Sequence, residues 1–224
     1  IVDAGIDAKN ERTAIREIPA GILSQTEALI FVGVSSIIFI FSSAMLSTLC
    51  LVLSVPVLAV LLGYSYTKRF TRYCHLYLGF AIGLAPIGAW VAITGTLSVS
   101  VVFLSLALMT YIAGFDILYA CQDIEFDRQE GLFSLPSKIG AQKAMAVSWV
   151  LHGLTLVCLL AMHLTFGMHP VFLVFIAMIA GLLVIEHRLV RPDDLTHINL
   201  AFFHINSVVS VLLFIGVLVQ GVFK

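Results

Sequence analysis

Long apolar segments follow one another along the whole chain, separated by short polar breaks. A helix that spans a bilayer needs about 20 mostly apolar residues. Seven segments meet this requirement: residues 25–43, 46–65, 74–94, 98–121, 141–165, 168–188 and 199–222. Pro56 and Pro86 fall inside two of them, and neighbouring helices can accommodate the resulting kinks. The pattern predicts an all-α fold, a polytopic transmembrane bundle of about seven helices.

The connections between these predicted helices are of two alternating kinds. One kind is short and uncharged, and it comprises residues 42–47, 95–98 and 165–169. The other kind is long and charged, and it comprises residues 3–24, 66–73, 122–143 and 186–198. Eleven of the twelve Lys and Arg residues lie in the second kind, and Lys224 is the exception. Because Lys and Arg are enriched in cytoplasmic loops, we expect the charged connections to lie on the cytoplasmic face.

The acidic residues follow the same distribution. All thirteen Asp and Glu residues lie on that face, with Glu27 and Asp116 just inside helix ends. Membrane orientation depends on Lys and Arg and hardly on acids. One explanation is simply that long loops are polar. The set as a whole favours a polar cavity at one membrane face.

The composition indicates a membrane protein, because a single soluble core could not bury this much apolar surface. The chain is 60% hydrophobic and 11% charged, whereas soluble domains are about 25% charged. The lipid bilayer is therefore an expected partner, and nothing in the net charge of −1 calls for nucleic acid. The four cysteines have neither metal-ligand spacing nor a disulfide pattern, so we expect reduced packing residues. The chain opens at Ile1 among charged residues, so we expect the natural N-terminus to be missing.

The most informative motif is a series of three acids, Asp116, Asp123 and Asp127, followed by Arg128. If helix 98–121 continues past the membrane surface, the three carboxylates share one face, because positions four and seven apart are neighbours. Like charges on one face repel, so the motif indicates a cation partner, and Mg²⁺ with its oxygen ligands fits. The alternative is a solvated acidic loop with Arg128 and Lys138 as counter-ions. Asp116 lies deep in an apolar helix, and an acid in such a position favours a functional site over a solvated loop.

A second acidic pair, Asp3 and Asp7, repeats the spacing of Asp123 and Asp127 on the same predicted face. Lys9, Arg12 and Arg16 follow it. The spacing alone is a weak signal. Two such pairs facing each other would hold two metal ions around one polyphosphate, so we predict Asp3, Asp7, Asp123 and Asp127 as metal ligands.

The remaining polar segments are basic. Residues 64–72 combine Tyr64 with Lys68 and Arg69, which suit a cationic clamp on a departing diphosphate. The same residues also suit an ordinary membrane anchor, and both roles are compatible. The segment 186–194 is the last charged loop, and His204 in the following helix is expected to be an interhelical hydrogen-bonding residue.

These motifs resemble the UbiA superfamily of intramembrane aromatic prenyltransferases. Residues 3–21 resemble the end of its first Asp-rich motif, residues 64–69 its Y-x3-K-R element, and residues 114–140 its second Asp-rich motif. Residues 186–206 resemble the 4-hydroxybenzoate polyprenyltransferase-like branch, which serves ubiquinone or menaquinone synthesis. The resemblance implies one domain over residues 1–224, nine helices around a lipid-open cavity in the intact fold, and the absence of the first two here.

The resemblance also implies a reaction. Mg²⁺ would bind the diphosphate of a polyprenyl donor, and a hydroxylated aromatic acid would attack the allylic cation. We expect Lys68, Arg69 and Asp116 to be catalytic, Asp116 through acceptor contact or proton removal. Substrate contacts are expected at Arg12, Arg16, Tyr64, Lys68, Arg69, Tyr119, Arg128 and Lys138. Many members carry a basic residue where this chain has Ala4, which leaves room for an aromatic acid other than a benzoate.

Two other functions stay open at this level. A naphthoate-type acid of menaquinone synthesis is an alternative acceptor for the same chemistry. A membrane transporter is an alternative of another class, because intramembrane acids also mark ion pathways. The acids cluster at one face and no inverted repeat is evident, which favours the enzyme. We expect a protein of the bacterial inner membrane with its active site on the cytoplasmic face. The oligomeric state and the prenyl chain length do not follow from the sequence.

Overall fold

The computed structural model describes residues 1–223, without the side chain of Phe202; Lys224 lies outside this description. Within it, seven helical segments are long and apolar enough to cross a membrane, which confirms the predicted all-α bundle. Six are built on one long helix each: α2 (Gln25–Leu46), α3 (Thr48–Thr67), α4 (Cys74–Thr94), α5 (Val99–Ala120), α8 (Ala141–Phe166) and α9 (Val171–Leu189). The seventh ends in α11 (Asn206–Val219).

Two of the predicted helices are interrupted where they approach the charged loops. After α5, a 3₁₀ turn (Cys121–Asp123) leads into the short helix α6 (Ile124–Gln129). The last span begins as α10 (Ile198–Leu200), passes through a π-helical turn (Ala201–Ile205) and continues as α11. Two further short helices, α1 (Ala4–Asp7) and α7 (Leu135–Ile139), lie in the charged connections.

Helix ends are set by ordinary local chemistry. Ser24 and Glu27 form a capping box at the start of α2, in which each side chain accepts from the other residue's backbone N–H. Gly95 and Gly167 end α4 and α8 in the left-handed conformation that glycine adopts without strain. The predicted helix 168–188 begins only at Val171, because Pro170 precedes its first turn.

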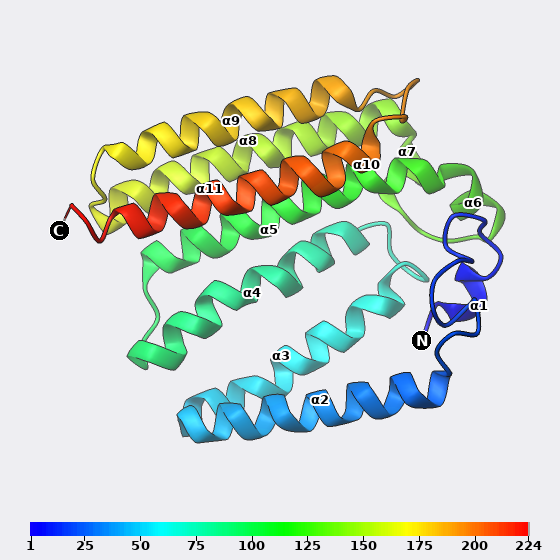
Figure 1. Ribbon diagram of the computed structural model, residues 1–224, viewed down its shortest axis with the longest axis horizontal. Helices are drawn as coiled ribbons and strands as arrows, with labels where there is room; N and C mark the ends of the chain where they lie inside the picture. The colour runs from blue at the N-terminus through cyan, green and yellow to red at the C-terminus, as the bar shows by residue number, and fades with distance from the viewer. Residues whose placement is uncertain (224) are drawn as a thin grey trace.

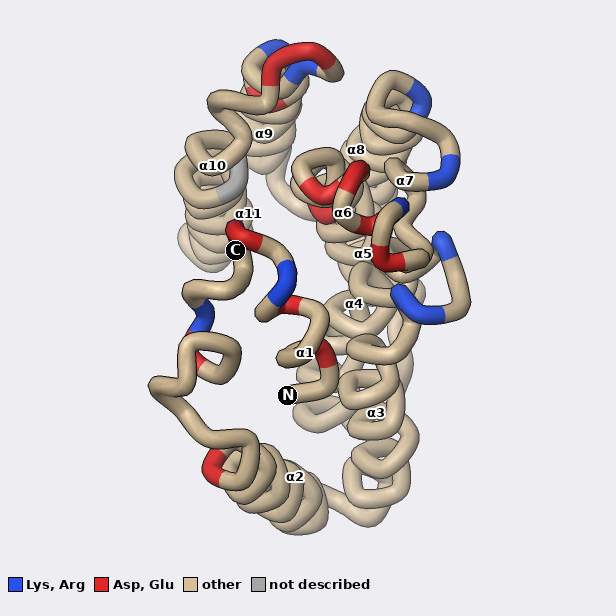
Figure 2. The backbone as a smooth tube through the Cα atoms, turned by 90° about the vertical axis from the view of Figure 1, so that its right-hand side faces the viewer, with Lys and Arg blue, Asp and Glu red and all other residues tan. Residues whose placement is uncertain are grey.

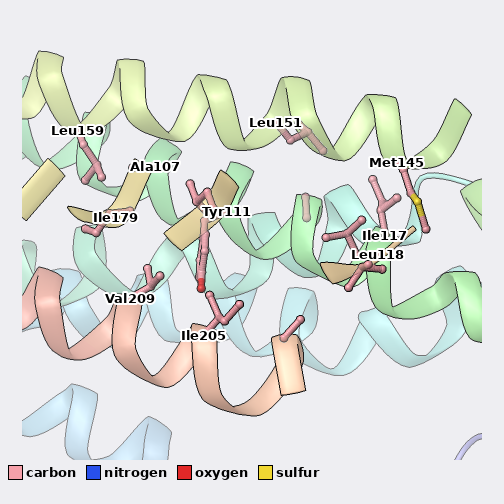
Figure 3. Packing of buried hydrophobic residues seen from close by; sticks show 14 of the residues in the cluster. Ala107, Tyr111, Ile117, Leu118, Met145, Leu151, Leu159, Ile179, Ile205 and Val209 are labelled. Atoms are coloured by element: carbon pink, nitrogen blue, oxygen red, sulfur yellow. The ribbon is translucent and has the colours of Figure 1, made fainter. Parts of the chain in front are cut away.

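Helix α5 is the centre of the bundle, with α4 on one side and α8 on the other (Figure 1). The approach of α4 to α5 depends on Gly79, because a Cβ there would lie 2.2 Å from the carbonyl oxygen of Met109. Helices α5, α8, α9 and α11 enclose the main apolar core. Figure 3 shows part of that core around Tyr111, Leu151, Ile179 and Val209.

Helices α2 and α3 form the outer wall and expose most of their apolar side chains. Such faces suit contact with lipid tails. Between them and α4 lies an apolar cavity of about 650 Å³. Its wall on α3 extends from Cys50 to Leu61, toward the charged end of the bundle.

The four charged connections gather at one end of the bundle. Figure 2 looks onto this end, where the Lys, Arg, Asp and Glu segments surround the chain start and α6. The short uncharged connections lie at the opposite end (Figure 1). The structure thus brings together the four segments that the charge pattern predicted to share one face.

Candidate active site

A polar cavity of about 200 Å³ opens at the charged end. Its wall is supplied by the segment around α1, the end of α3, the start of α4, and the stretch from the end of α5 through α6 to Leu132. The predicted site residues on this wall are Asp3, Asp7, Arg12, Arg16, Tyr64, Lys68, Asp116, Tyr119 and Asp123. Folding therefore brings most of the predicted site residues around one cavity.

Each of the four predicted metal-binding carboxylates has a basic partner in this structure. The ion pairs are Asp3 with Arg69 at 3.2 Å, Asp7 with Arg16 at 2.9 Å, Asp123 with Arg12 at 2.5 Å and Asp127 with Lys68 at 2.7 Å. The first two carboxylates are partly exposed, and the last two are buried. The repulsion expected among the acids is thus relieved by Lys and Arg from the same loops.

Arg12 holds Asp123 through two of its nitrogens and reaches Tyr119 with a third. Its Nε and Nη2 donate to the two oxygens of Asp123, and its Nη1 donates to the Tyr119 hydroxyl at 2.9 Å. The guanidinium carbon also lies 5.1 Å from the centre of the Tyr119 ring, within range of a cation–π contact. Burial lowers the pKa of Arg12, but the hydrogen bond and the charge of Asp123 outweigh it, so the net pKa shift is upward. Arg12 therefore stays a cation at the cavity wall.

Asp127 lies away from the cavity wall, and its side chain has no exposed surface. The Lys68 ammonium is 2.7 Å from its Oδ1, and neither Asp127 oxygen accepts a hydrogen bond from the residues that the structure describes. The predicted continuation of one regular α-helix through the three acids is wrong, because the 3₁₀ turn (Cys121–Asp123) interrupts it between Asp116 and the two later acids. Asp123, at the N-cap of α6, lines the cavity, whereas Asp127 does not, and the two carboxylates meet different cations.

Asp116 has a partner that the sequence analysis missed. Its Oδ2 lies 2.6 Å from Nδ1 of His75, and the backbone N–H of Leu135 donates to Nε2 of the same ring at 3.3 Å. His75 stands at the start of the apolar helix α4, directly after a basic loop. A histidine at this boundary between a basic loop and an apolar helix was the sequence signal that could have identified it. Asn10 was missed as well, and its Nδ2 donates to Asp123 at 3.1 Å.

Arg128 and Lys138 were expected to contact substrate, but the structure places both outside the cavity wall. Arg128 donates to Glu125 and to the backbone oxygen of Ser137, each at 3.0 Å. The Lys138 ammonium lies 4.2 Å from the centre of the Phe133 ring. Both side chains therefore stabilise the 125–138 loop through contacts within it. Arg69 also lies off the wall, and it reaches the site through Asp3.

The carboxylates offer oxygen donors to a metal ion, but they are spread around the cavity. Within residues 1–223, no three His, Cys, Asp or Glu side chains are grouped so as to hold a metal ion by themselves. Mg²⁺ usually binds through one or two carboxylates together with substrate phosphates and water. The oxygens of Asp127, which lack hydrogen bonds, and Asp123 on the wall supply donors of that kind. The residues fit Mg²⁺ in type, with the substrate completing the site.

Comparison with known proteins identifies the family of the chain. Residues 1–208 match the UbiA prenyltransferase family. The chain is 29% identical to a 4-hydroxybenzoate octaprenyltransferase of Photobacterium profundum over 97% of this chain and 75% of that protein. It is 28% identical to the 4-hydroxybenzoate octaprenyltransferase of Pseudomonas fluorescens over 99% of this chain and 74% of the relative.

The fold has close solved counterparts. The apo structure of a UbiA homolog from Aeropyrum pernix K1 superposes with a TM-score of 0.86 and 30% identity, over 98% of this chain and 81% of the other. A structure of digeranylgeranylglyceryl phosphate synthase superposes with a TM-score of 0.73 over 100% of this chain and 78% of the other. At 20% identity, the second supports the fold alone. The expected enzyme class, an aromatic prenyltransferase embedded in a membrane, is confirmed. The chain belongs to the UbiA prenyltransferase family.

Proposed function

We propose that this enzyme transfers a polyprenyl group from polyprenyl diphosphate to a hydroxylated aromatic acid such as 4-hydroxybenzoate, in the synthesis of ubiquinone or menaquinone. We place the reaction at the cytoplasmic face of a bacterial inner membrane. The observation that carries the proposal is the polar cavity at the charged end, with four acid–base ion pairs in or next to its wall. Helix α3 lines both this cavity and the apolar one. The names of the bacterial relatives support the acceptor.

The basic side chains suit a diphosphate. Lys68, Arg12 and Arg16 line the cavity with 35%, 30% and 52% of their side-chain surface exposed. The Asp7–Arg16 pair is the more open one and contributes about 0–1 kcal/mol, so a diphosphate displaces it at small cost. The pairs of Arg12 and Lys68 have buried carboxylates, so a diphosphate takes these cations only if another cation replaces them at Asp123 and Asp127. The same cations then offset the negative charge that develops on the leaving group.

The carboxylates released in this way are the proposed magnesium ligands. Asp3, Asp7, Asp123 and Asp127 would hold Mg²⁺ together with the diphosphate oxygens. When bound, the metal supplies Lewis-acid stabilisation of the leaving diphosphate. In the structure each of these four carboxylates has a cationic partner.

The two cavities suit the two parts of a prenyl diphosphate. Leu61 lines the apolar cavity, and Tyr64, one helical turn further along α3, lines the polar one. A prenyl tail extending along α3 would leave its diphosphate beside Lys68. The rings of Tyr64 and Tyr119 would then stabilise the allylic cation by cation–π attraction. The apolar wall would keep out water, which would otherwise trap that cation.

The experiment that tests this function is prenyl transfer in membranes that contain the enzyme. A labelled polyprenyl diphosphate is incubated with 4-hydroxybenzoate, with a hydroxynaphthoate, or with no acceptor, each with and without Mg²⁺. We expect a prenylated benzoate that forms only with Mg²⁺. Transfer to the naphthoate alone would reassign the acceptor. Membranes that neither release diphosphate nor prenylate any acid would contradict the enzyme and favour a transporter.

A further inference from the structure

Asp116 differs from the other four carboxylates of the site in the type of its partner. Among the described residues, Asp3, Asp7, Asp123 and Asp127 each pair with Lys or Arg, whereas Asp116 pairs with His75. Asp116 lies in α5 one helical turn before Ala120, and its side chain is 21% exposed on the cavity wall. It therefore enters the cavity from the side of the membrane interior.

The hydrogen bonds of His75 determine where its proton lies. Its Nε2 accepts the Leu135 N–H at 3.3 Å, so this nitrogen presents its lone pair. The ring proton is thus assigned to Nδ1, which donates to Oδ2 of Asp116 at 2.6 Å. His75 is also the second residue of α4, so its ring is carried by a regular helix. The pair is an imidazole whose Nδ1–H donates to the Asp116 carboxylate.

The surroundings hold this pair in one orientation. His75 is 3% exposed, and Leu135 begins the short helix α7, which Ser134 and Ser137 cap reciprocally. The imidazole is therefore fixed between two backbone elements. The second Asp116 oxygen, Oδ1, accepts no hydrogen bond from the residues that the structure describes. It is available to a proton donor inside the cavity.

We infer that His75 is a positioning residue which holds Asp116 as the base that removes the ring proton of the aromatic acceptor. The inference rests on the function proposed above. His75 holds one oxygen of Asp116 and leaves the other toward the cavity, where it can accept a proton. Asp123 and Asp127 are instead held by Arg12 and Lys68, the cations proposed to meet the diphosphate.

The step balances without any further reactant. The allylic C–O bond breaks, and its electron pair leaves with the diphosphate. The acceptor ring then forms a C–C bond to the allylic carbon and becomes cationic. Asp116 takes the proton from the attacked ring carbon, and the C–H electron pair restores aromaticity. His75 keeps its own Nδ1 proton throughout and stabilises the carboxylate before transfer.

The test is a kinetic isotope effect on prenyl transfer, measured with 4-hydroxybenzoate deuterated on the ring beside the hydroxyl. We expect no isotope effect for the wild-type enzyme, in which loss of diphosphate limits the rate. Asp116→Asn should lower kcat by about 10²–10⁴-fold, the usual contribution of a general base. His75→Leu should lower it by about 10- to 100-fold, as for loss of an orienting partner. Both variants should show a primary isotope effect.

His75→Gln is the conservative variant, because its amide can donate to Asp116 and accept from Leu135. We expect it to restore most of kcat and to remove the isotope effect. His169→Leu is the matched control, because His169 is exposed in the connection between α8 and α9. It should behave as wild type.

Three outcomes would overturn the inference: normal kcat in His75→Leu, loss of kcat in both variants without an isotope effect, or no rescue by His75→Gln. If His75→Leu does not fold, Asp116→Asn keeps the test decisive, because it nearly preserves side-chain size. A wild-type enzyme that transfers prenyl groups to no aromatic acid would instead overturn the proposed function, and the inference with it.

Discussion

The ammonium of Lys68 lies 2.7 Å from Oδ1 of Asp127, a carboxylate with no exposed surface. Lys68 closes α3, and Asp127 lies in α6 after the end of α5. Next to this pair, the Phe133 N–H donates to the backbone oxygen of Lys68 at 2.7 Å. The contact therefore joins the basic element to the second acidic motif, and it has consequences for both stability and catalysis.

Removal of Lys68 should destabilise the protein. Breaking a buried ion pair from one side costs about 3–5 kcal/mol, because a charge is left buried without a partner. Since 35% of the Lys68 side chain is exposed, we expect Lys68→Met to lie at the low end, about 3 kcal/mol. Adding Asp127→Asn should recover most of the loss. Unfolding in detergent, followed for the two single variants and the double variant, measures the coupling.

Arg69→Met is the matched control for stability, because its ion pair with Asp3 is exposed on both sides. Its cost should stay below about 1 kcal/mol. Equal destabilisation by Lys68→Met and Arg69→Met would show that burial of Asp127 does not determine the cost.

Arg69→Ala should nevertheless lower turnover. Its guanidinium holds Asp3 and the backbone oxygen of Val2, and it adds positive charge at the cavity mouth. If it acts on the developing diphosphate as one oxyanion donor does, the loss is about 2.7–4 kcal/mol in activation free energy. Prenyl transfer by equal amounts of inserted enzyme measures the effect. Unchanged turnover would leave Arg69 as a membrane anchor.

Asp123→Asn should abolish turnover at ordinary Mg²⁺ concentrations while the protein still folds. The substitution keeps the side-chain size but removes the charge that is proposed to bind metal. Arg12, which loses its anion, is 30% exposed and can be solvated. Chelation of Mg²⁺ should have the same effect on wild type without unfolding it, because the carboxylates keep their basic partners.

Glu125→Gln is the control for this prediction. Glu125 lies two residues from both Asp123 and Asp127, yet its side chain is 78% exposed. Among the described residues it forms an ion pair only with Arg128. Turnover measured against Mg²⁺ concentration should be close to wild type. If Glu125→Gln and Asp123→Asn lose activity equally, the acids act as a general negative surface and the specific site is rejected.

Arg12→Lys should be a damaging substitution although it keeps the charge. Lysine has one ammonium and cannot donate to both Asp123 oxygens and the Tyr119 hydroxyl in the same geometry. Losing hydrogen bonds to a charged group costs about 1.5–3 kcal/mol, so we expect a clear fall in kcat/KM for the prenyl donor. Arg16→Lys should be mild, because Arg16 makes a single contact to Asp7. Equal effects at the two positions would argue against a specific role for Arg12.

The membrane orientation can be tested by cysteine labelling. Phe70 and Gln129 are exposed at the charged end, and Leu97 is 65% exposed in the short connection at the other end. In a background without the native cysteines, an impermeant thiol reagent should reach Phe70→Cys and Gln129→Cys from the cytoplasmic side only. It should reach Leu97→Cys from the opposite side. Labelling of positions 70 and 129 from different sides would contradict the fold.

The sequence alone determined the helices, the charged end and the family. Hydrophobic length is a local property, so the seven spans could be read from it, and Ser24 with Glu27 marks the start of α2. The grouping of charges in alternate connections predicted one polar end, since consecutive spans must return across the membrane. Motif spacing placed Asp3, Asp7, Asp116 and Asp123 in one site.

Only the tertiary structure decided which acid meets which base. Arg12 pairs with Asp123 across 111 residues and His75 with Asp116 across 41, and no local pattern encodes such pairings. The 3₁₀ turn after α5 interrupted the helix between Asp116 and Asp123, and the contacts of the 125–138 loop hold Arg128 and Lys138 away from the cavity. The physical reason is that the partner of each charged side chain depends on how the helices pack. At Gly79, the lack of a side chain allows α4 to approach α5 closely.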